Sequence, residues 1–302
     1  MSENLVQQEP RTLGKDLLPV GPIAYGLWRY TTDKLGEATE LLETAIELGM
    51  NLIDNADVYG FDWGGEGFGA CEELLGQVLV ASPHLRDQIV ISTKGGIAPP
   101  IPYDSSPKYL RSACEASLKR LQVEQIDLYQ IHRPDIYTHP SEVAETLDSL
   151  VVEGKIKAVG VSNYTPEQVS ALSNYLQSPL VTTQPEFSVN CLTPLRDGTF
   201  DQCSSEGIIP LAWSPLAGGK LATGEGVRAE LVELLDEIAE RESVDRATVA
   251  VAFVLAHPTK PIAIVGTQQT SRLKKIAKAV DVNLNRDDVY NLIEASDGVP
   301  LP

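Results

Sequence analysis

The sequence predicts an α/β fold, a (β/α)8 TIM barrel in which eight parallel strands close into a cylinder. Short apolar runs alternate with amphipathic helical stretches along most of the 302 residues. Strict alternation of strands and helices indicates a parallel sheet, and continuously apolar strands are typical of a sheet that is buried on both faces. Eight strand–helix units favour closure into one barrel over the alternative, an open doubly wound sheet.

Each predicted element follows from a local pattern. The apolar runs predict strands at residues 22–26, 51–56, 88–96, 126–132, 156–163, 179–186, 207–215 and 261–267. The amphipathic stretches predict helices at 35–49, 68–82, 106–121, 141–154, 165–176, 195–206, 228–241, 245–256, 271–280 and 286–296. Thr165-Pro166-Glu167 is a typical helix start, and Gly154 a typical helix stop. We expect a single domain over residues 1–302, with residues 1–12 as a loosely ordered extension.

The open-sheet alternative requires a glycine-rich dinucleotide-binding turn directly after a strand. The segment GEGFGA at residues 65–70 matches the pattern GxGxxA. However, the polar segment DVYGFDWG precedes it where an apolar strand is required. We therefore interpret residues 65–70 as a loop before a helix.

Composition excludes several classes of partner. The formal net charge is -18, which argues against binding to nucleic acid or to an anionic membrane, since both need a basic surface. No apolar run reaches the roughly 18 residues of a membrane span, and the polar N-terminus does not resemble a signal peptide. The cysteines form no CxxC pair and do not cluster with the histidines, at Cys71, Cys114, Cys191 and Cys203. We expect a cytoplasmic protein with reduced thiols and no metal site.

Polar residues occur where the predicted strands end, which is where barrels of this kind place their active sites. Strand 2 ends at Asp54 and is followed by Tyr59, strand 3 ends at Lys94, and strand 4 ends at His132. The later strands end with uncharged polar or aromatic residues, at Ser162, Asn163, Gln184, Trp213 and Ser214.

The first four of these residues form a chemically coherent set. A semi-buried Lys94 needs a counterion, which Asp54 on the neighbouring strand can supply. An ammonium group beside Tyr59 favours the phenolate and so lowers the pKa of that phenol, which makes it a usable general acid. His132 then donates a hydrogen bond to a substrate oxygen. Each residue alone has an ordinary structural explanation, but their coincidence at consecutive strand ends favours a proton-delivery site. Asp57 is interpreted as a loop carboxylate.

Six segments together resemble the aldo-keto reductase superfamily. They are NLIDNADVYG, ISTKGG, LYQIHRPD, VGVSN, TTQPEFS and LAWSPLAGGKL, and the resemblance extends from about Leu13 to the last helix. It implies a (β/α)8 barrel that reduces aldehydes and ketones with NAD(P)H.

The resemblance also assigns roles to individual residues. It implies a catalytic tetrad of Asp54, Tyr59, Lys94 and His132, with Tyr59 as the proton donor. It implies that Ser162, Asn163 and Gln184 hold the nicotinamide carboxamide and that Trp213, where family members commonly have Tyr, stacks on the ring. Further cofactor contacts are implied for Gly26, Leu27, Asp54, Ser214, Pro215, Leu216, Gly218, Lys220, Gly266, Thr267, Ser271 and Arg272. The family's usual Asn in the last of these segments is replaced by Ile276.

NADPH is expected to be preferred, with NADH possible, because Arg272 after the last strand is suited to clamp a 2′-phosphate. The substrate is expected to be a small carbonyl compound bound near Trp28, Tyr59 and His132, with Phe61 and Trp63 as further candidates from the neighbouring loop. Two alternatives remain open at this point. One is a Schiff-base aldolase with Lys94 as nucleophile, and the other is a catalytically weak NADP(H)-binding regulatory subunit of a channel.

Overall fold

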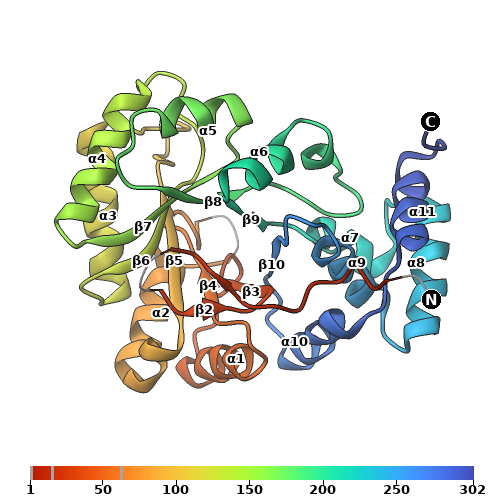
Figure 1. The fold of residues 1–302 in the computed structure, drawn as a ribbon. Coiled ribbons are helices and arrows are strands. Elements are labelled where there is room, and N and C mark those ends of the chain that lie inside the picture. Colours follow the sequence, from red (N-terminus) through yellow and green to blue (C-terminus); the bar gives the residue numbers. More distant parts are fainter. Residues whose placement is uncertain (1–2, 15–16, 62–63) are drawn as a thin grey trace.

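Eight parallel strands close into a barrel, in the order β10-β3-β4-β5-β6-β7-β8-β9 (Figure 1). The computed structural model describes residues 3–14, 17–61 and 64–302. The barrel strands are β3 Ile23–Gly26, β4 Leu52–Asp54, β5 Val90–Gly95, β6 Ile126–Ile131, β7 Ile156–Ser162, β8 Leu180–Gln184, β9 Ile209–Ala212 and β10 Ile262–Val265. Because β10 pairs with both β3 and β9, the sheet is closed and the predicted barrel is confirmed.

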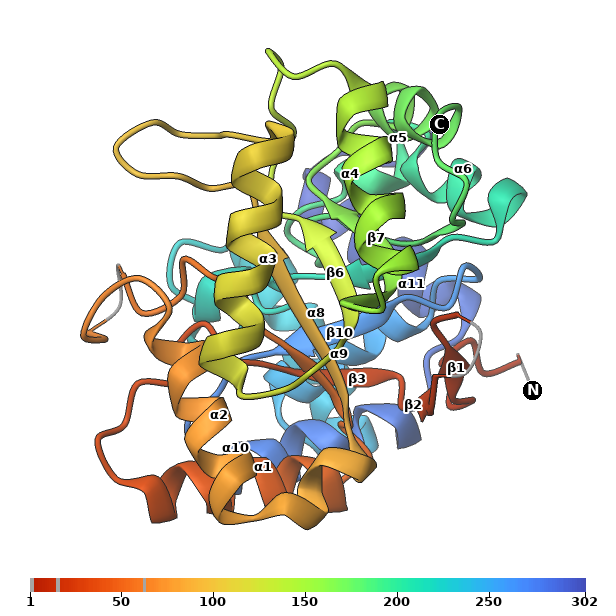
Figure 2. The same ribbon diagram turned by 90° about the vertical axis from the view of Figure 1, so that its left-hand side faces the viewer.

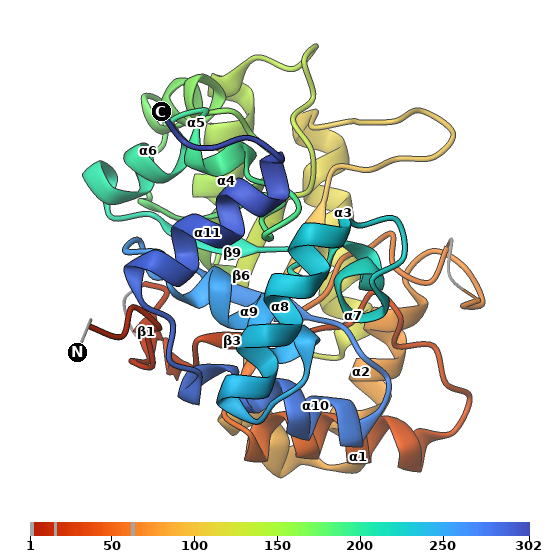
Figure 3. The same cartoon turned by 90° about the vertical axis from the view of Figure 1, so that its right-hand side faces the viewer.

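Helices surround the barrel, as Figures 1 and 3 show. Those that alternate with strands are α1 Leu35–Glu47, α2 Ala70–Ala81, α3 Pro107–Leu121, α4 Pro140–Val152, α5 Pro166–Ser173, α6 Thr199–Glu206 and α10 Thr270–Ile276. The helices α7 Lys220–Thr223, α8 Ala229–Glu242 and α9 Arg246–Leu255 separate β9 from β10, and α11 Arg286–Asp297 ends the fold. Short 3-10 turns lie at η1 Pro83–Gln88, η2 Thr193–Leu195, η3 Ala217–Gly219 and η4 Ala277–Asp281.

A two-stranded hairpin that the sequence pattern did not predict closes the N-terminal end of the barrel. Its strands are β1 Arg11–Thr12 and β2 Pro19–Val20, which pair antiparallel. Leu13 and Val20 are fully buried in the same apolar cluster as Leu52 and Leu128 from inside the barrel. The strands are only two residues long, so they carry no detectable periodicity in the sequence.

The N-terminal segment is more firmly held than expected. Leu5 donates its amide to the carbonyl of Leu284 at 2.8 Å, and the amide of Gln7 donates to Leu255 at 3.2 Å. Val6 is 7% exposed and packs in the main core. Residues 3–12 therefore differ from the loosely ordered extension that was expected, because backbone hydrogen bonds tie them to the C-terminal part of the chain (Figure 1).

The interior of the barrel changes from apolar to polar along the strands. Leu52, Val90 and Leu128 lie in the apolar interior cluster. Two residues further along the same strands, on the same face, come Asp54, Ser92 and Gln130. The buried polar groups therefore gather toward the C-terminal mouth of the barrel. The loop between β4 and α2 and the loop between β5 and α3 project on one side of the molecule (Figure 2).

In the described part of the chain, no helix is both long and apolar enough to cross a membrane. No group of three or more His, Cys, Asp or Glu residues within residues 3–14, 17–61 and 64–302 is arranged to hold a metal ion. The cysteines are free thiols.

Candidate active site

Lys94 joins Asp54 and Tyr59 into one hydrogen-bonded group at the mouth of the barrel. Its ammonium Nζ donates to Asp54 Oδ2 at 2.8 Å, to the Asn55 carbonyl at 2.7 Å and to the Tyr59 hydroxyl at 3.2 Å. The Lys94 side chain is fully buried, and that of Asp54 is 3% exposed. Burial lowers the pKa of Lys94, but the Asp54 carboxylate and the hydrogen bonds to Asp54 and Tyr59 outweigh burial, so its pKa is raised. Lys94 is therefore a cation in the folded protein.

The expected effect of Lys94 on Tyr59 is present but does not dominate. Burial raises the pKa of the Tyr59 phenol, and the Lys94 charge lowers it only in part, so the net pKa is above its ordinary value. The prediction that the pKa of Tyr59 is lowered is therefore wrong for this structure. The cause is the desolvation of the phenolate, which opposes the nearby cation. Tyr59 is consequently protonated at neutral pH.

His132 lies against Tyr59 in the same mouth. The two rings are 5.8 Å apart, at an angle of 80°. Burial lowers the pKa of His132 well below its usual value, and the charges of Lys94 and Arg133 lower it further. His132 is therefore a neutral imidazole, which can donate one hydrogen bond to a ligand without carrying charge.

The interpretation of Asp57 as a loop carboxylate is confirmed, because the residue lies in the turn that follows β4. It is fully buried, and neither of its carboxyl oxygens has a hydrogen-bond partner among the described residues. Burial raises its pKa well above the usual value, and the nearby Glu72 carboxylate raises it further. Glu72 itself is held by Arg120 Nε at 2.7 Å and by Thr93 Oγ1 at 2.5 Å. Asp57 is therefore a buried acid within the loop between β4 and α2, and its surroundings disfavour the ionised form.

Sequence reasoning missed a polar layer directly beneath the Asp54–Lys94 pair. Ser92 Oγ donates to Asp54 Oδ1 at 3.2 Å, and Gln130 Nε2 donates to Ser92 Oγ at 3.0 Å. Thr182 Oγ1 donates to Gln130 Oε1 at 3.3 Å. Ser92 and Gln130 stand two positions before Lys94 and His132, so the same alternation that places those residues could have found them.

The three residues expected to hold the nicotinamide carboxamide lie together with Trp213. Trp213 Nε1 donates to Asn163 Oδ1 at 3.0 Å. Asn163 Nδ2 donates to Ser162 Oγ at 2.8 Å and to the His132 carbonyl at 3.2 Å. Ser162 Oγ in turn donates to the Gln184 carbonyl at 3.1 Å. Trp213 therefore fixes the orientation of the Asn163 amide. The sequence suggested only that the Trp213 ring stacks on the nicotinamide, and did not reveal this second role.

Backbone strain marks the strand ends on this side of the mouth. Asn163, Ser214 and Ala217 have φ angles of 59°, 55° and 49°, in the left-handed region that non-glycine residues rarely adopt. Such conformations tend to collect at functional sites. The Ser214 hydroxyl accepts a hydrogen bond from the Gly218 amide at 2.9 Å, which shapes the segment expected to bind pyrophosphate.

That segment borders a cavity of about 430 Å³. Its lining comprises Gly218, Gly219, Lys220, Thr223, Glu225 and Gly226. Gly218 and Gly219 have φ angles of 71° and 104°, and a Cβ atom on either would meet open space. Glycine is therefore favoured at both positions by the backbone conformation and not by crowding. Pro215 is buried beneath the segment, and Leu216 packs partly on the core.

The residues after β10 that were expected to bind the adenosine phosphate lie mostly at the surface. Ser271 and Arg272 are exposed, and Gly266 and Thr267 are half-buried. The helix they open, α10, has only seven residues. Ile276, where the family commonly has Asn, is buried in the core. Any phosphate contact here therefore depends on side chains such as that of Arg272.

Comparisons with known proteins identify the family of this chain. A model of the aldo/keto reductase family matches residues 22–297. This chain belongs to the aldo/keto reductase family. The 6-dehydroglucose reductase of Novosphingobium aromaticivorans is 45% identical over 295 residues, which cover 97% of each chain. The 6-dehydroglucose reductase of Agrobacterium fabrum is 34% identical over 289 residues, covering 92% of this chain and 94% of that protein.

A solved structure supports the same assignment for this aldo/keto reductase. The glycerol dehydrogenase of Gluconobacter oxydans superposes with a TM-score of 0.83 at 27% identity, covering 97% of this chain and 96% of the other. The family and the names of these relatives support an oxidoreductase that reduces carbonyl groups.

Other predicted contacts of this aldo/keto reductase occupy different environments. Gly26 and Leu27 are buried, and the Leu27 amide donates to the Asp54 carbonyl at 2.8 Å. Trp28 and Phe61 are 43% and 54% exposed, which leaves their rings accessible after β3 and β4. Trp63 lies outside the described residues.

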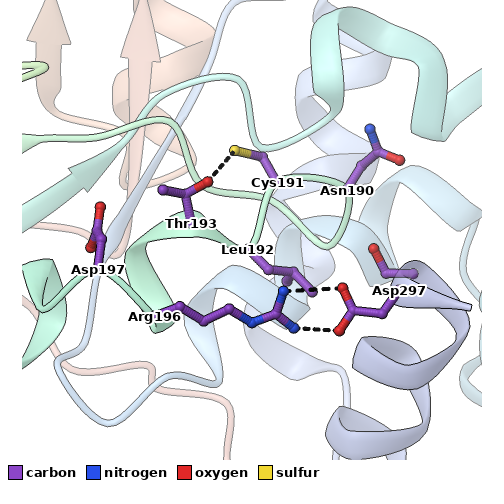
Figure 4. Close-up of a pocket in the computed structure, with 8 residues that line it drawn as sticks. Asn190, Cys191, Leu192, Thr193, Arg196, Asp197 and Asp297 are labelled. Atoms are coloured by element: carbon purple, nitrogen blue, oxygen red, sulfur yellow. Dashed lines mark hydrogen bonds and ion pairs between the residues drawn. The ribbon is translucent and has the colours of Figure 1, made fainter. Parts of the chain in front are cut away.

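A second cavity of this aldo/keto reductase, of about 450 Å³, contains none of the predicted site residues. It lies between the loop that follows β8 and the end of α11 (Figure 4). Arg196 forms a two-pronged ion pair with Asp297 there, which joins the loop to the C-terminal helix. Cys191 contacts Thr193 on the same loop. We interpret this cavity as a by-product of the Arg196–Asp297 clip.

Proposed function

We propose that this aldo/keto reductase reduces an aldehyde or ketone to an alcohol with NADPH, and that Tyr59 donates the proton. The main support for this proposal is that the Lys94 ammonium contacts both Asp54 and the Tyr59 hydroxyl at the barrel mouth. A buried cation beside a phenol stabilises the phenolate that remains after proton transfer. It therefore acts in the transition state, where stabilisation raises the rate.

Each member of the tetrad has a distinct task in this proposal. A nicotinamide cofactor, when bound, supplies a hydride to the carbonyl carbon. Neutral His132 orients the carbonyl oxygen by a hydrogen bond, and Tyr59 gives its hydroxyl proton to that oxygen as negative charge develops. Lys94, at 3.2 Å from the hydroxyl, stabilises the resulting phenolate, and Asp54 is the counterion of Lys94. Proton transfer of this kind contributes typically about 10²–10⁴-fold to the rate.

The donor set of the described residues suits a nicotinamide cofactor. The amides of Asn163 and Gln184 and the hydroxyl of Ser162 gather on one side of the mouth, and Trp213 supplies an aromatic face beside them. The cavity lined by Gly218 allows a close approach of the backbone to a diphosphate. These residues would hold the two halves of the cofactor.

The preference for NADPH over NADH rests on the exposed Arg272. Lys274 and Lys275 lie close to it in sequence, on a protein whose net charge is -18. A guanidinium can clamp a 2′-phosphate with two parallel hydrogen bonds, and NADH has no such group. Thr267 and Ser271 add hydroxyl donors.

We further propose a polyhydroxylated aldehyde as the substrate class. Two relatives that match more than nine-tenths of this chain are named 6-dehydroglucose reductases. The chain itself offers Arg133, next to His132, and Glu186, two residues beyond Gln184. Both are half-buried, and among the described residues neither has an ion-pair partner. Arg133 lowers the pKa of His132 and partly offsets the burial that raises the pKa of Glu186, so its charge acts on both.

A half-buried charge without a partner is costly, so these two groups are suited to meet a ligand. A guanidinium donates hydrogen bonds and a carboxylate accepts them, and neighbouring hydroxyls on a sugar do both. A negatively charged substrate group would be attracted by Arg133 but repelled by Glu186, which favours a neutral polyol.

The aldolase alternative fits the geometry poorly. A Schiff base requires a neutral amine, whereas Lys94 is held as a cation by Asp54 and its pKa is raised. The lysine therefore suits electrostatic support of Tyr59 rather than nucleophilic attack.

The deciding experiment follows loss of NADPH absorbance with a six-carbon dialdose, hexanal and a phosphorylated aldose. We expect oxidation of NADPH with both unphosphorylated aldehydes and a higher kcat/KM for the dialdose. Arg133→Gln and Glu186→Gln should lower kcat/KM for the dialdose and leave hexanal nearly unchanged. No turnover with any carbonyl compound would refute the reductase, and equal losses for both aldehydes would refute the substrate class.

A further inference from the structure

Gln184 connects the expected nicotinamide site with the catalytic carboxylate. Gln184 Nε2 donates to Asp54 Oδ1 at 3.0 Å, although the two residues are 130 positions apart in the chain. Gln184 and Asp54 are each 2% exposed. The same amide therefore lies at the boundary between the tetrad and the group that would hold the cofactor.

The orientation of the Gln184 amide follows from the charge of its partner. Asp54 is paired with Lys94 at 2.8 Å, so its carboxylate only accepts hydrogen bonds. The nitrogen of Gln184 must face it, and the oxygen Oε1 must face the other way. Oε1 accepts no hydrogen bond from a described residue, and it is not sealed off as the orphaned oxygens of Asp57 are. Gln184 thus presents an open acceptor.

The carboxylate cannot easily turn to release Gln184. Ser92 accepts a hydrogen bond from Gln130 Nε2 at 3.0 Å, so the single hydroxyl proton of Ser92 is free to point at Asp54 Oδ1, 3.2 Å away. Lys94 holds the other oxygen, Oδ2. Donors on both oxygens fix the carboxylate plane, and this plane sets the direction of the Gln184 amide.

We propose that Asp54 has a second task, as the residue that sets the Gln184 amide so that its oxygen accepts the N–H of the nicotinamide carboxamide. Asp54 and Gln184 then couple the orientation of the cofactor to the charged Asp54–Lys94 pair. This inference rests on the proposed function, because it requires a nicotinamide cofactor in the mouth. Gln184 acts here as a binding residue and Asp54 as its positioning residue.

The protein should therefore distinguish two cofactors that differ in one group. In 3-acetylpyridine adenine dinucleotide phosphate, a methyl group replaces the carboxamide NH₂, so it has nothing to donate to Gln184 Oε1. Wild-type protein should bind NADP+ about tenfold more tightly than this analogue, the value of one neutral hydrogen bond. Gln184→Met should bring the two affinities within about twofold by weakening NADP+ alone.

Asp54→Asn tests the positioning role without removing Gln184. Lys94 keeps the oxygen of the new amide, so the NH₂ of that amide faces Gln184 and the Gln184 amide turns over. The carboxamide NH₂ then meets another NH₂, and the preference for NADP+ should disappear. Gln202→Met, which makes the same chemical change in α6 outside the barrel, is the matched control and should keep the preference.

Titration calorimetry with NADP+ and with the acetylpyridine analogue, in the absence of substrate, measures all of these affinities without turnover. Loss of the preference in both Gln184→Met and Asp54→Asn supports the coupling. A preference of about tenfold that survives in Asp54→Asn, or a wild type that binds NADP+ and the analogue equally, overturns it. Failure of the wild type to bind NADP+ at all would instead overturn the proposed function.

Discussion

Replacing Lys94 by Met separates the catalytic and the structural contributions of the buried ion pair. The change removes the ammonium and its hydrogen bonds to Asp54, Asn55 and Tyr59 while keeping a long apolar side chain. Asp54 is then a buried carboxylate without its counterion. Removing one partner of a buried pair typically costs about 3–5 kcal/mol.

The structure favours the lower end of that range. Asp54 Oδ1 keeps the hydrogen bonds from Ser92 and Gln184, so part of its solvation is retained. A loss of about 3 kcal/mol lowers the melting temperature of a 302-residue domain by about 5 °C. Turnover should fall by at least about 10²-fold, because the Tyr59 phenolate loses its stabilising charge.

Two further variants make the reasoning testable. Asp54→Asn combined with Lys94→Met removes both charges, so the melting temperature should recover toward that of the wild type while turnover stays lost. Lys157→Met is the matched control: Lys157 Nζ donates to Asp127 at 2.8 Å, but its side chain is 34% exposed and Arg86 also pairs with Asp127. It should change the stability by about 1 kcal/mol or less and leave turnover intact.

Thermal unfolding followed by circular dichroism and NADPH-linked steady-state kinetics provide the measurements. The pH dependence of the stability provides a further check, because the direction of its change can be predicted. The pKa of Lys94 is raised in the folded state, so its stabilising contribution is present below about 10.4, the unfolded value, and is lost as the pH rises through the folded pKa. A Lys94→Met protein with wild-type stability and near-normal turnover would refute the assignment of Lys94.

Three other outcomes follow from the site and the fold. Tyr59→Phe should lower kcat by about 10²–10⁴-fold while NADP+ still binds in calorimetry, since only one hydroxyl is removed, and a near-normal kcat contradicts the proton-donor role. Arg272→Ala should weaken NADPH by about 1.5–3 kcal/mol and leave NADH almost unchanged in fluorescence titrations, whereas equal losses contradict the 2′-phosphate contact. Burial lowers the pKa of His257 to about 4, so the unfolded chain takes up a proton that the folded one refuses, and stability falls as the pH drops below about 6.5. His257→Gln should therefore flatten the acid side of the stability profile measured by urea unfolding, and an unchanged profile would show that His257 plays no part.

The sequence determined the architecture because the relevant signals are local. Apolar runs and amphipathic stretches depend on neighbouring residues, and every barrel strand was found within a few residues of its predicted range. The hairpin of β1 and β2 escaped because its strands are too short to show a period. The positions of Asp54, Lys94 and His132 could be predicted as well, because parallel strands must bring their C-terminal ends to one mouth.

Tertiary structure decided the protonation of the site. The sequence shows that Lys94 is near Tyr59, but whether the phenol is more or less acidic depends on the balance of charge and burial, and burial prevailed. Asp57 illustrates the same point, since its place in a loop could be predicted from the sequence whereas its full burial, near Glu72 of α2 and Arg120 of α3, could not. Burial is a property of the closed barrel and its helices, so no local pattern could supply it.

Tertiary structure also decided which polar groups meet. Gln184 and Asp54 come from strands that are not neighbours in the sheet, and Trp213 reaches Asn163 across 50 positions in the chain. Such contacts depend on the register of each strand pair and on closure of the barrel, which bring inward side chains from opposite walls within hydrogen-bonding distance. The sequence therefore determined which residues stand at the mouth, and the closed barrel determined which of them touch, because residues facing one another across a cylinder have no fixed separation along the chain.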